Sequence, residues 1–466
     1  MIIPMPDVRA VRPAHMRMAS MLAWLVAMVA LFLPQLASAQ SILRDAETEA
    51  LLAEISNPLV KAAGMEPGNV RMVLINDKSI NAFVAGGQVV YLHSGLIMAA
   101  DSANEVQGVI AHELGHVAGG HAVYNGGAKA AGNISILSLL LGAAAIAAGA
   151  GEAGAGILMA GQQAAIGKYL AFSRTQESSA DAAGASYLTK SGISGKGMIE
   201  FFSKLRNLEY RYAVPQDDDS AYQRTHPLTG DRIETLRDDL QNDPAWDTPV
   251  DPATEARFQR VKAKLEGYIG DPKQTLRLYP ESNTSIPARY ARAYAWHKAA
   301  YPEKAMAAAA DLVAQDPNDP YFLELQGQIL LESGKPAEAL AALRRATELT
   351  NNQPLIAALF GHALIATEDS ANFAEAETVL KAAVSRDNEN PFAWMQLGVV
   401  YNDRGDVPRA ALATAELSVL QGNAAMALRS SETALGSLPQ GTPDWVRAQD
   451  ISMLARDAME KQKKKR

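Results

Sequence analysis

Hydrophobic and polar residues follow two different periods in the first half of the chain. Residues 41–67 place apolar side chains at the spacing of a helix, whereas residues 69–93 alternate as strands do and contain Gly86 and Gly87 as turn residues. Residues 170–210 return to the spacing of amphipathic helices. The pattern predicts an α+β, mostly α, first domain in which a small sheet lies among helices.

In the second half of the chain the pattern repeats. Units begin at Pro287, Pro320, Pro354 and Pro391, and the second and third of these starts lie 34 residues apart. The last unit contains the spacing W-x2-L-G-x2-Y, which is typical of tetratricopeptide repeats. The two helices of such a unit cannot bury their apolar face alone, so we expect the units to stack into an α-solenoid.

The N-terminus has the pattern of an export signal. Three arginines precede the apolar run MLAWLVAMVALFLP, and Ala-Ser-Ala follows at 37–39. This order is typical of a secretory signal peptide, which we expect to be cleaved near Ala39. An uncleaved anchor helix is the alternative, but the apolar run is short for a membrane span. An exported chain without cysteine indicates the periplasm of a Gram-negative bacterium.

These patterns predict the division into domains. The Pro- and Asp-rich stretch DPAWDTPVDP is typical of a linker, and the closing KQKKKR of a solvated tail that could also contact anionic lipid. We expect a signal peptide at 1–39, a first domain at 40–242, a linker at 243–252, a tetratricopeptide-repeat domain at 253–455 and a basic tail at 456–466.

Composition narrows the classes of function. The chain has 466 residues, too many for one ordinary core, and it is 48% hydrophobic and 20% charged, as a globular protein is. Its formal net charge of -8 argues against general binding of nucleic acid. The lack of cysteine excludes disulfides, thiol catalysis and zinc bound by cysteine.

The most informative stretch is VIAHELGHVAGGH at residues 109–121. Residues i and i+4 lie on one face of a helix, so His112 and His116 can both direct a ring nitrogen at one Zn²⁺. Glu113 falls beside them, where it can take a proton from the attacking water. Buried histidines that bind nothing are costly, so a purely structural helix is the weaker interpretation.

A catalytic zinc site needs a third protein ligand. His121 comes five residues after His116, so we expect it to point away from the ligand face and to lie behind the ligands or at the surface. His93 is expected to be a partly buried strand residue. Glu177 and Asp181 stand four residues apart on a predicted helix. Glu177 can complete a set of two histidines and one glutamate, and Asp181 can orient a ligand histidine.

Several motifs in this order resemble the M48 metalloproteases. HELGH is followed by an apolar hairpin at 134–167, by ESSAD and by RTHPLTGDRI, and NAFVAGGQVVYLHSGLI precedes it. The resemblance implies a zincin-like domain with one Zn²⁺ per chain. It implies zinc ligands in His112, His116 and Glu177, and catalytic roles for Glu113, His226 and Asp181. It also implies that Asp181 supports the ligands from behind, that Arg232 supports the loop of His226, and that Asn81, Ala82 and Phe83 bind substrate at an edge strand.

Together these features predict an exported zinc metalloendopeptidase whose repeats recruit protein clients. The resemblance implies clients among unfolded or stalled outer-membrane β-barrel proteins, and contact of the repeats with the machinery that assembles these barrels. A chaperone or scaffold that hardly cleaves is the alternative. The segment 134–167 could be a lid or a peripheral membrane contact. His226 could stabilise the oxyanion of the reaction or cap the zinc at rest, and we expect capping.

Overall fold

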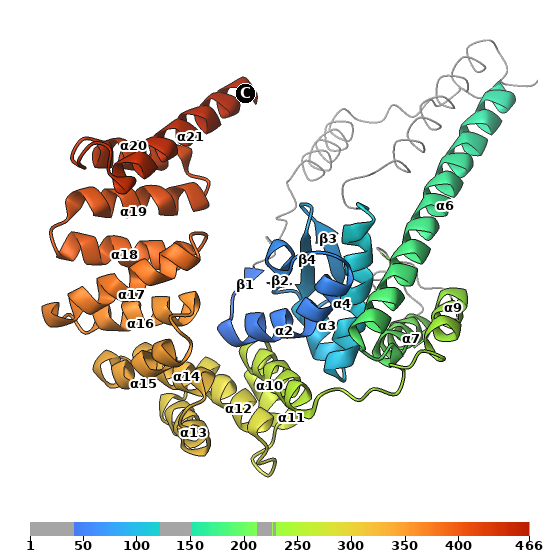
Figure 1. Ribbon diagram of the computed structural model, residues 1–466, viewed down its shortest axis with the longest axis horizontal. Coiled ribbons are helices and arrows are strands. Elements are labelled where there is room, and N and C mark those ends of the chain that lie inside the picture. The colour runs from blue at the N-terminus through green and yellow to red at the C-terminus, as the bar shows by residue number, and fades with distance from the viewer. Residues whose placement is uncertain (1–41, 122–150, 212–225, 227–229, 466) are drawn as a thin grey trace, which may run out of the picture. The chain divides into compact units, whose positions relative to one another are not determined.

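The computed structural model describes residues 42–121, 151–211, 226 and 230–465. The first part of this chain combines one sheet with several helices, and helix pairs follow in the second part (Figure 1). No helix within the described residues is both long and apolar enough to cross a membrane. The predicted signal peptide and the first half of the segment 134–167 lie outside the described residues.

A small mixed sheet begins the first part. Its strands are β1 (Ile42–Leu43), β2 (Arg71–Ile75), β3 (Ala82–Ala85) and β4 (Val89–His93), in the order β1-β2-β4-β3. β2 and β4 run parallel, whereas β1 and β3 pair antiparallel at the two edges. The β3–β4 turn has Gly86 and Gly87 at φ of 65° and 95°, a region that glycine adopts readily. The strands and glycine turn predicted within residues 69–93 are present.

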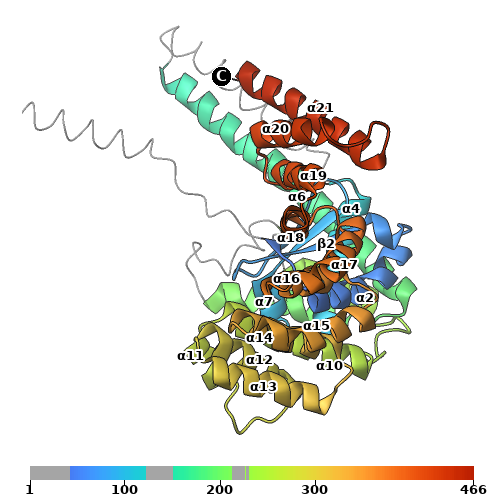
Figure 2. The same ribbon diagram turned by 90° about the vertical axis from the view of Figure 1, so that its left-hand side faces the viewer.

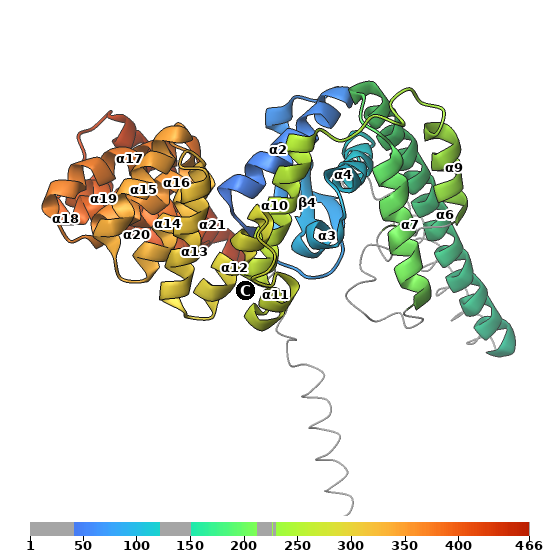
Figure 3. The same ribbon diagram turned by 90° about the horizontal axis from the view of Figure 1, so that it is seen from below.

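One helix lies at the centre of the first part. The helices there are α2 (Ala46–Ala62), the short η1 (Pro67–Asn69), α3 (Ser94–Ala99), α4 (Ala103–Ala118), α6 (Gly151–Ser191), α7 (Lys196–Arg211) and α9 (Gly230–Leu240). α4 packs against α2, α6 and α7, and every residue from Ala103 to His116 is buried (Figure 3). A helix buried on all sides fits the apolar sequence of this stretch.

α6 is longer than the sequence pattern predicts. The Gly/Ala-rich run after residue 151 and the first amphipathic helix of residues 170–210 form one helix of 41 residues. No proline interrupts this stretch, so nothing in the sequence forces the helix to end between the two patterns.

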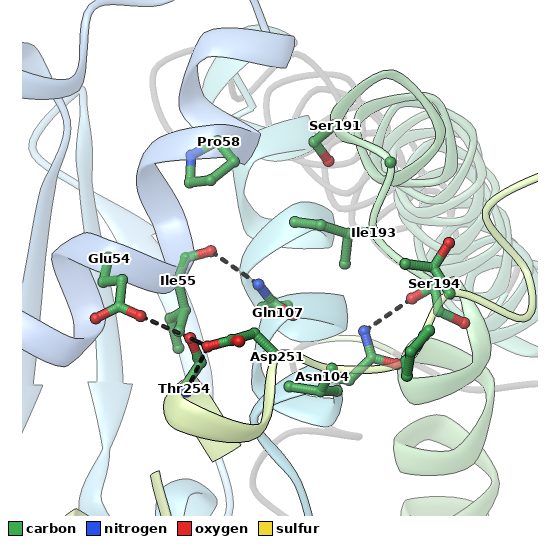
Figure 4. A pocket seen from close by; sticks show the side chains of 14 residues that line it. Glu54, Ile55, Pro58, Asn104, Gln107, Ser191, Ile193, Ser194, Asp251 and Thr254 are labelled. Atoms are coloured by element: carbon green, nitrogen blue, oxygen red, sulfur yellow. Dashed lines mark hydrogen bonds between the residues drawn. The ribbon is translucent and has the colours of Figure 1, made fainter. Parts of the chain in front are cut away.

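Side-chain amides fix the N-terminal half of α4 to its neighbours (Figure 4). Asn104 donates from Nδ2 to the carbonyl of Ser194 at 2.8 Å and accepts at Oδ1 from the N–H of Gly197 at 2.9 Å. Gln107 donates to the carbonyl of Ile55 on α2 at 3.4 Å. These bonds border a cavity of about 300 Å³ and satisfy polar groups that burial would otherwise leave unpaired.

The second part is a solenoid of antiparallel helices. They are α10 (Pro252–Ile269), α11 (Pro272–Leu278), α12 (Ile286–Lys298), α13 (Pro302–Gln315), α14 (Pro320–Glu332), α15 (Pro336–Leu349), α16 (Pro354–Ala366), the short η3 (Ser370–Asn372), α17 (Phe373–Arg386), α18 (Pro391–Asp403), α19 (Val407–Leu420), α20 (Ala424–Leu435) and α21 (Pro443–Lys465). From α12 to α21 each helix packs on the next (Figure 2). The predicted unit starts coincide with helix starts at α14, α16 and α18, where proline suits the first turn. α21 continues through most of the predicted basic tail.

α10 joins the solenoid to the first part. Its side chains Phe258, Val261 and Leu265 pack into the same hydrophobic core as α2, α3 and α4. On the same helix, Arg260 pairs with Glu47 of α2. The predicted linker therefore precedes a helix that completes the first core, although the domain boundary at 243–252 itself stays a prediction.

Candidate metal centre

The helix that carries HELGH has defined ends. Ser102 begins it as the N-cap, because its hydroxyl accepts from the N–H of Glu105 at 3.3 Å. His112 and His116 lie one turn apart, both are buried, and their Nε2 atoms are 3.1 Å apart. Both rings therefore direct a nitrogen at the same point.

Glycines let α6 approach α4 closely enough to bring its acidic residues to this point. A Cβ on Gly115 of α4 would lie 2.5 Å from the carbonyl oxygen of Ala180 on α6. A Cβ on Gly184 would lie 3.0 Å from the backbone nitrogen of His112. At Gly115 only glycine permits the contact without moving a backbone, and at Gly184 a side chain would need a shift of a few tenths of an ångström, so Gly115 limits the separation of the helices most strictly.

Four residues offer ligand atoms for one metal ion. One atom from each of His112, His116, Glu177 and His226 lies within 4.8 Å of the others, and all four residues are buried. Glu177 Oε1 is 3.4 Å from His116 Nε2, and Glu177 Oε2 is 3.5 Å from His112 Nε2. A tetrahedral zinc ion with bonds of 2.0–2.1 Å separates its ligand atoms by about 3.3 Å. The donor set therefore fits zinc in both chemistry and spacing.

A second layer of polar groups holds these ligand atoms. Asp181 Oδ1 lies 2.9 Å from Nδ1 of His112. Arg232 donates to both oxygens of Asp181, at 2.7 Å and 2.9 Å, and its Nη1 is 3.2 Å from Glu177 Oε2. A carboxylate on the outer nitrogen of a ligand histidine fixes the tautomer that leaves Nε2 for the metal.

The charges of the site favour a cation at its centre. Burial raises the pKa of Glu177, but hydrogen bonds from His112, His116 and His226 outweigh it and lower the pKa well below its ordinary value. Burial would lower the pKa of His112, but Asp181 and Glu177 reverse this and raise it to about 10 without a metal. The carboxylates that attract this proton would equally attract a metal ion.

Glu113 and His226 lie next to each other beside the ligand atoms. Glu113 is completely buried, and its Oε1 is 3.6 Å from Nε2 of His226. His226 directs its Nδ1 at the ligand set, 3.1 Å from Glu177 Oε2 and 3.2 Å from His112 Nε2. The same ring is thus within reach of both the ligand atoms and the carboxylate predicted to act as base.

The structure brings most of the predicted site residues together. His112, His116, Glu113, Glu177, Asp181, His226 and Arg232 all lie in this cluster. Asn81, Ala82 and Phe83 lie at and just before β3, an edge strand beside β4, and Phe83 stacks on Tyr91. His93 is a buried strand residue whose Nδ1 is 2.8 Å from Ser79 Oγ, and it lies outside the metal cluster.

Two contacts support the ligand histidines from behind, and sequence reasoning missed the first of them. The ring of Phe202 on α7 meets His112 edge to face, with centroids 5.6 Å apart. His121, predicted to lie behind the ligands or at the surface, places Nδ1 2.8 Å from Nδ1 of His116, on the side of that ring away from the ligand set. A Gly-Gly pair directly before His121 was the available signal for a chain reversal at this point.

The arrangement of HELGH on a buried helix, with a glutamate from a second helix, defines a metallopeptidase site. The profile of peptidase family M48 matches residues 45–240. Metalloprotease LoiP of Escherichia coli K12 is 33% identical over 198 residues, which cover 41% of this chain and 70% of that protein. The chain belongs to peptidase family M48.

Other relatives extend beyond the peptidase domain. The beta-barrel assembly-enhancing protease of Yersinia pestis is 26% identical over 441 residues, 90% of this chain and 86% of that protein. A relative from Vibrio cholerae is 28% identical over 301 residues, and the match spans 63% of this chain and 60% of that protein's length. Among solved structures, the tetratricopeptide protein YrrB is 20% identical with a TM-score of 0.31, over 38% of this chain and 92% of that one.

Proposed function

We propose that this chain is a periplasmic zinc-dependent endopeptidase that acts on misfolded or stalled outer-membrane β-barrel proteins. The observation that most directly supports this activity is the buried set of four ligand atoms with Glu113 beside it. The names of relatives that match most of this chain support the client class. The predicted signal peptide, together with the Gram-negative sources of these relatives, supports the periplasm.

In this proposal His112, His116 and Glu177 bind one zinc ion, and Asp181 and Arg232 hold them in place. When bound, zinc polarises the scissile carbonyl and increases the acidity of water. Glu113 accepts a proton from the attacking water and returns it to the leaving amine. Its burial shields this proton transfer from bulk water.

His226 lies where it can fill two roles, one in the resting protein and one during the reaction. At rest, its Nδ1 supplies the fourth ligand atom and closes the site, as the short distances to Glu177 and His112 support. With substrate bound, the same ring can donate a hydrogen bond to the oxyanion that forms from the substrate carbonyl. We propose that capping prevails in the resting protein.

Substrate backbone would bind along β3. His93 on β4 donates to the carbonyl of Asn81, so Asn81 and Phe83 form the hydrogen-bonded pairs of the hairpin. The backbone groups of Ala82 and Val84 then point away from β4, where no strand of the described chain pairs with them; Ala82 is buried there and Val84 is partly exposed. An unfolded client that adds a strand there would place a peptide bond near the metal cluster.

The solenoid would recruit clients or the barrel assembly machinery. A stack of helix pairs provides an extended surface suited to protein partners. Exposed apolar side chains follow one face of α18, at Phe392, Met395 and Val399, as such a surface requires.

The test of the activity is Glu113→Gln. The substitution leaves the three ligands in place, so zinc content after dialysis should equal that of the wild type. Hydrolysis of unfolded casein should fall by about 10² to 10⁴ because the general base is lost. Wild-type rates in Glu113→Gln would show that Glu113 is not the base.

The same variant tests the chaperone or scaffold alternative, which the position of His226 in the ligand set favours. A protein that acts mainly through its solenoid should support barrel assembly equally well with Glu113 or Gln at this position. A protease should fail in this assay while its clients accumulate on the inactive protein, where crosslinking can identify them.

A further inference from the structure

The C-terminal end of α4 folds back on itself. The N–H of His121 donates to the carbonyl of His116 at 3.0 Å, and the N–H of Gly120 donates to the carbonyl of Val117 at 3.1 Å. Gly120 has φ of 64°, a left-handed conformation that favours glycine. These bonds form a Schellman motif, which reverses the chain directly after the second ligand histidine.

The reversal lays the ring of His121 over the end of the helix. A Cβ on Gly119 would lie 2.5 Å from Nε2 of His121, so the ring occupies the space that the missing side chain leaves. The rings of His116 and His121 have centroids 4.9 Å apart, and their Nδ1 atoms are separated by 2.8 Å. This distance is that of a hydrogen bond.

Two ring nitrogens at this distance need one proton between them. His116 directs Nε2 at the ligand set, and this nitrogen must be unprotonated to bind a metal. The proton of a neutral His116 therefore belongs on Nδ1, from which it is donated to Nδ1 of His121. We infer that His121 is a positioning residue that holds His116 in the tautomer and orientation that zinc binding requires. The inference rests on the proposed role of His116 as a zinc ligand.

The two ligand histidines are thus supported in different ways. Asp181 on α6 accepts from His112, whereas His121, five residues further along the chain, accepts from His116. A neutral imidazole orients the ligand ring without adding a second negative charge beside Glu177. The support of His116 is also local, so it forms together with the end of α4.

The test compares two variants of similar shape in the full mature chain. His121→Asn places an amide oxygen at the position of Nδ1 and can still accept, whereas His121→Leu places a methyl group there. Zinc affinity is measured by competition with a chelator of known affinity. His121→Leu should bind zinc about 10- to 100-fold more weakly, the usual effect of losing such a partner, and His121→Asn should remain within about threefold of the wild type.

Cobalt provides a second readout, because its visible absorption reports the geometry of the ligands. The spectrum should change in His121→Leu and be restored in His121→Asn. If His121→Leu does not fold, Gly119→Ala keeps the histidine but puts a methyl group against its ring, and it should weaken zinc binding similarly. Equal losses in the Asn and Leu variants would show a packing role only and overturn the inference.

A control separates this inference from the proposed function. His116→Ala should abolish tight zinc binding. If it does not, the proposed ligand set fails, and the inference about His121 fails with it. If His116→Ala abolishes binding but His121→Leu and Gly119→Ala bind zinc as the wild type does, only the role of His121 is overturned.

Discussion

The carboxylate of Glu177 shows how single residues depend on one another in this site. Three histidines contact its oxygens, and Arg232 lies 3.2 Å from Oε2. A buried carboxylate without such partners would be costly, so each neighbour stabilises the charge as well as the geometry. Substitutions at different residues of this cluster should therefore affect zinc binding and catalysis to different extents.

The role of His226 can be tested by replacement with alanine. If the ring caps the metal at rest, His226→Ala should cleave unfolded casein several-fold faster while it retains zinc through the other three ligands. Initial rates and zinc content are measured together, with Glu113→Gln as the inactive control. A fall in rate by about 10² to 10³ would instead indicate that the ring stabilises the oxyanion.

Glu324 on α14 predicts a dependence of stability on pH. Burial, opposed by Lys264 but reinforced by the charge of Asp45, raises the pKa of Glu324 to about 8. The folded state therefore keeps a proton that the unfolded state, with a pKa of about 4.3, has released. Its contribution to stability is present below pH 4 and is lost as pH rises to about 8.

Denaturant unfolding at pH 5 and pH 8.5 measures this effect. Glu324→Gln stays neutral, so it should be more stable than the wild type at pH 8.5 and nearly equal at pH 5. Glu332→Gln on the same helix is the matched control, because a hydrogen bond from His297 lowers the pKa of Glu332 and the substitution should not stabilise. No gain from Glu324→Gln at pH 8.5 would contradict the prediction.

The contact between α4 and α6 determines the site at the level of elements. Gly115 and Gly184 permit the approach that places Glu177 and Asp181 against the two histidines. The two helices come from sequence segments more than thirty residues apart, so their separation is a tertiary property. The positions of the ligand atoms relative to one another therefore depend on this one helix contact.

Gly115→Ala tests the contact. Its methyl group would lie 2.5 Å from the Ala180 carbonyl oxygen, so α6 must move away and zinc affinity should fall by at least about tenfold. Gly108→Ala is the control, because it meets the backbone of Met198 on α7 and should destabilise by about 1–3 kcal/mol without separating the ligands. Equal zinc affinity in both variants would remove the assigned role of Gly115.

The sequence predicts elements better than it predicts contacts between them. The zinc helix could be predicted, because the apolar period of residues 109–121 and the four-residue spacing of His112 and His116 lie within one short stretch of sequence. The contact of His121 with His116 could not be chosen over a surface position, because an angle of 100° per residue applies only within a helix and α4 ends at Ala118. The unbroken length of α6 and its approach at Gly115 depend on packing that no local pattern records.

At the scale of the whole molecule, α10 is part of both the solenoid and the hydrophobic core of the first part. It begins the solenoid, and it supplies Phe258, Val261 and Leu265 to the core that surrounds α4. Arg260 extends the connection, since it pairs with Glu47 of α2 and lies 2.5 Å from Asp319 at the start of α14. The peptidase part and the repeats are therefore joined by packing as well as by the chain.

Two truncated chains test this connection. A fragment of residues 40–270 keeps α10, and it should retain zinc and cleave a short flexible peptide. A fragment of residues 40–251 loses three buried side chains worth about 1.5–3 kcal/mol each, so it should unfold at a clearly lower Tm. Both should lose partners recruited by the solenoid. Equal Tm values would show that α10 does not stabilise the first part.

The position of α10 also affects the order in which the contacts of the first core can form. A chain that emerges from its N-terminus presents HELGH, then Glu177, then His226, and only afterwards the helix that completes the surrounding core. Contacts between residues distant in sequence form late, because a long loop must close first. The pairing of Glu47 with Arg260 spans more than two hundred residues, so this contact cannot form before the first helix of the solenoid is available. A newly made chain of this design would therefore complete its first core only when the first helix of the solenoid is available.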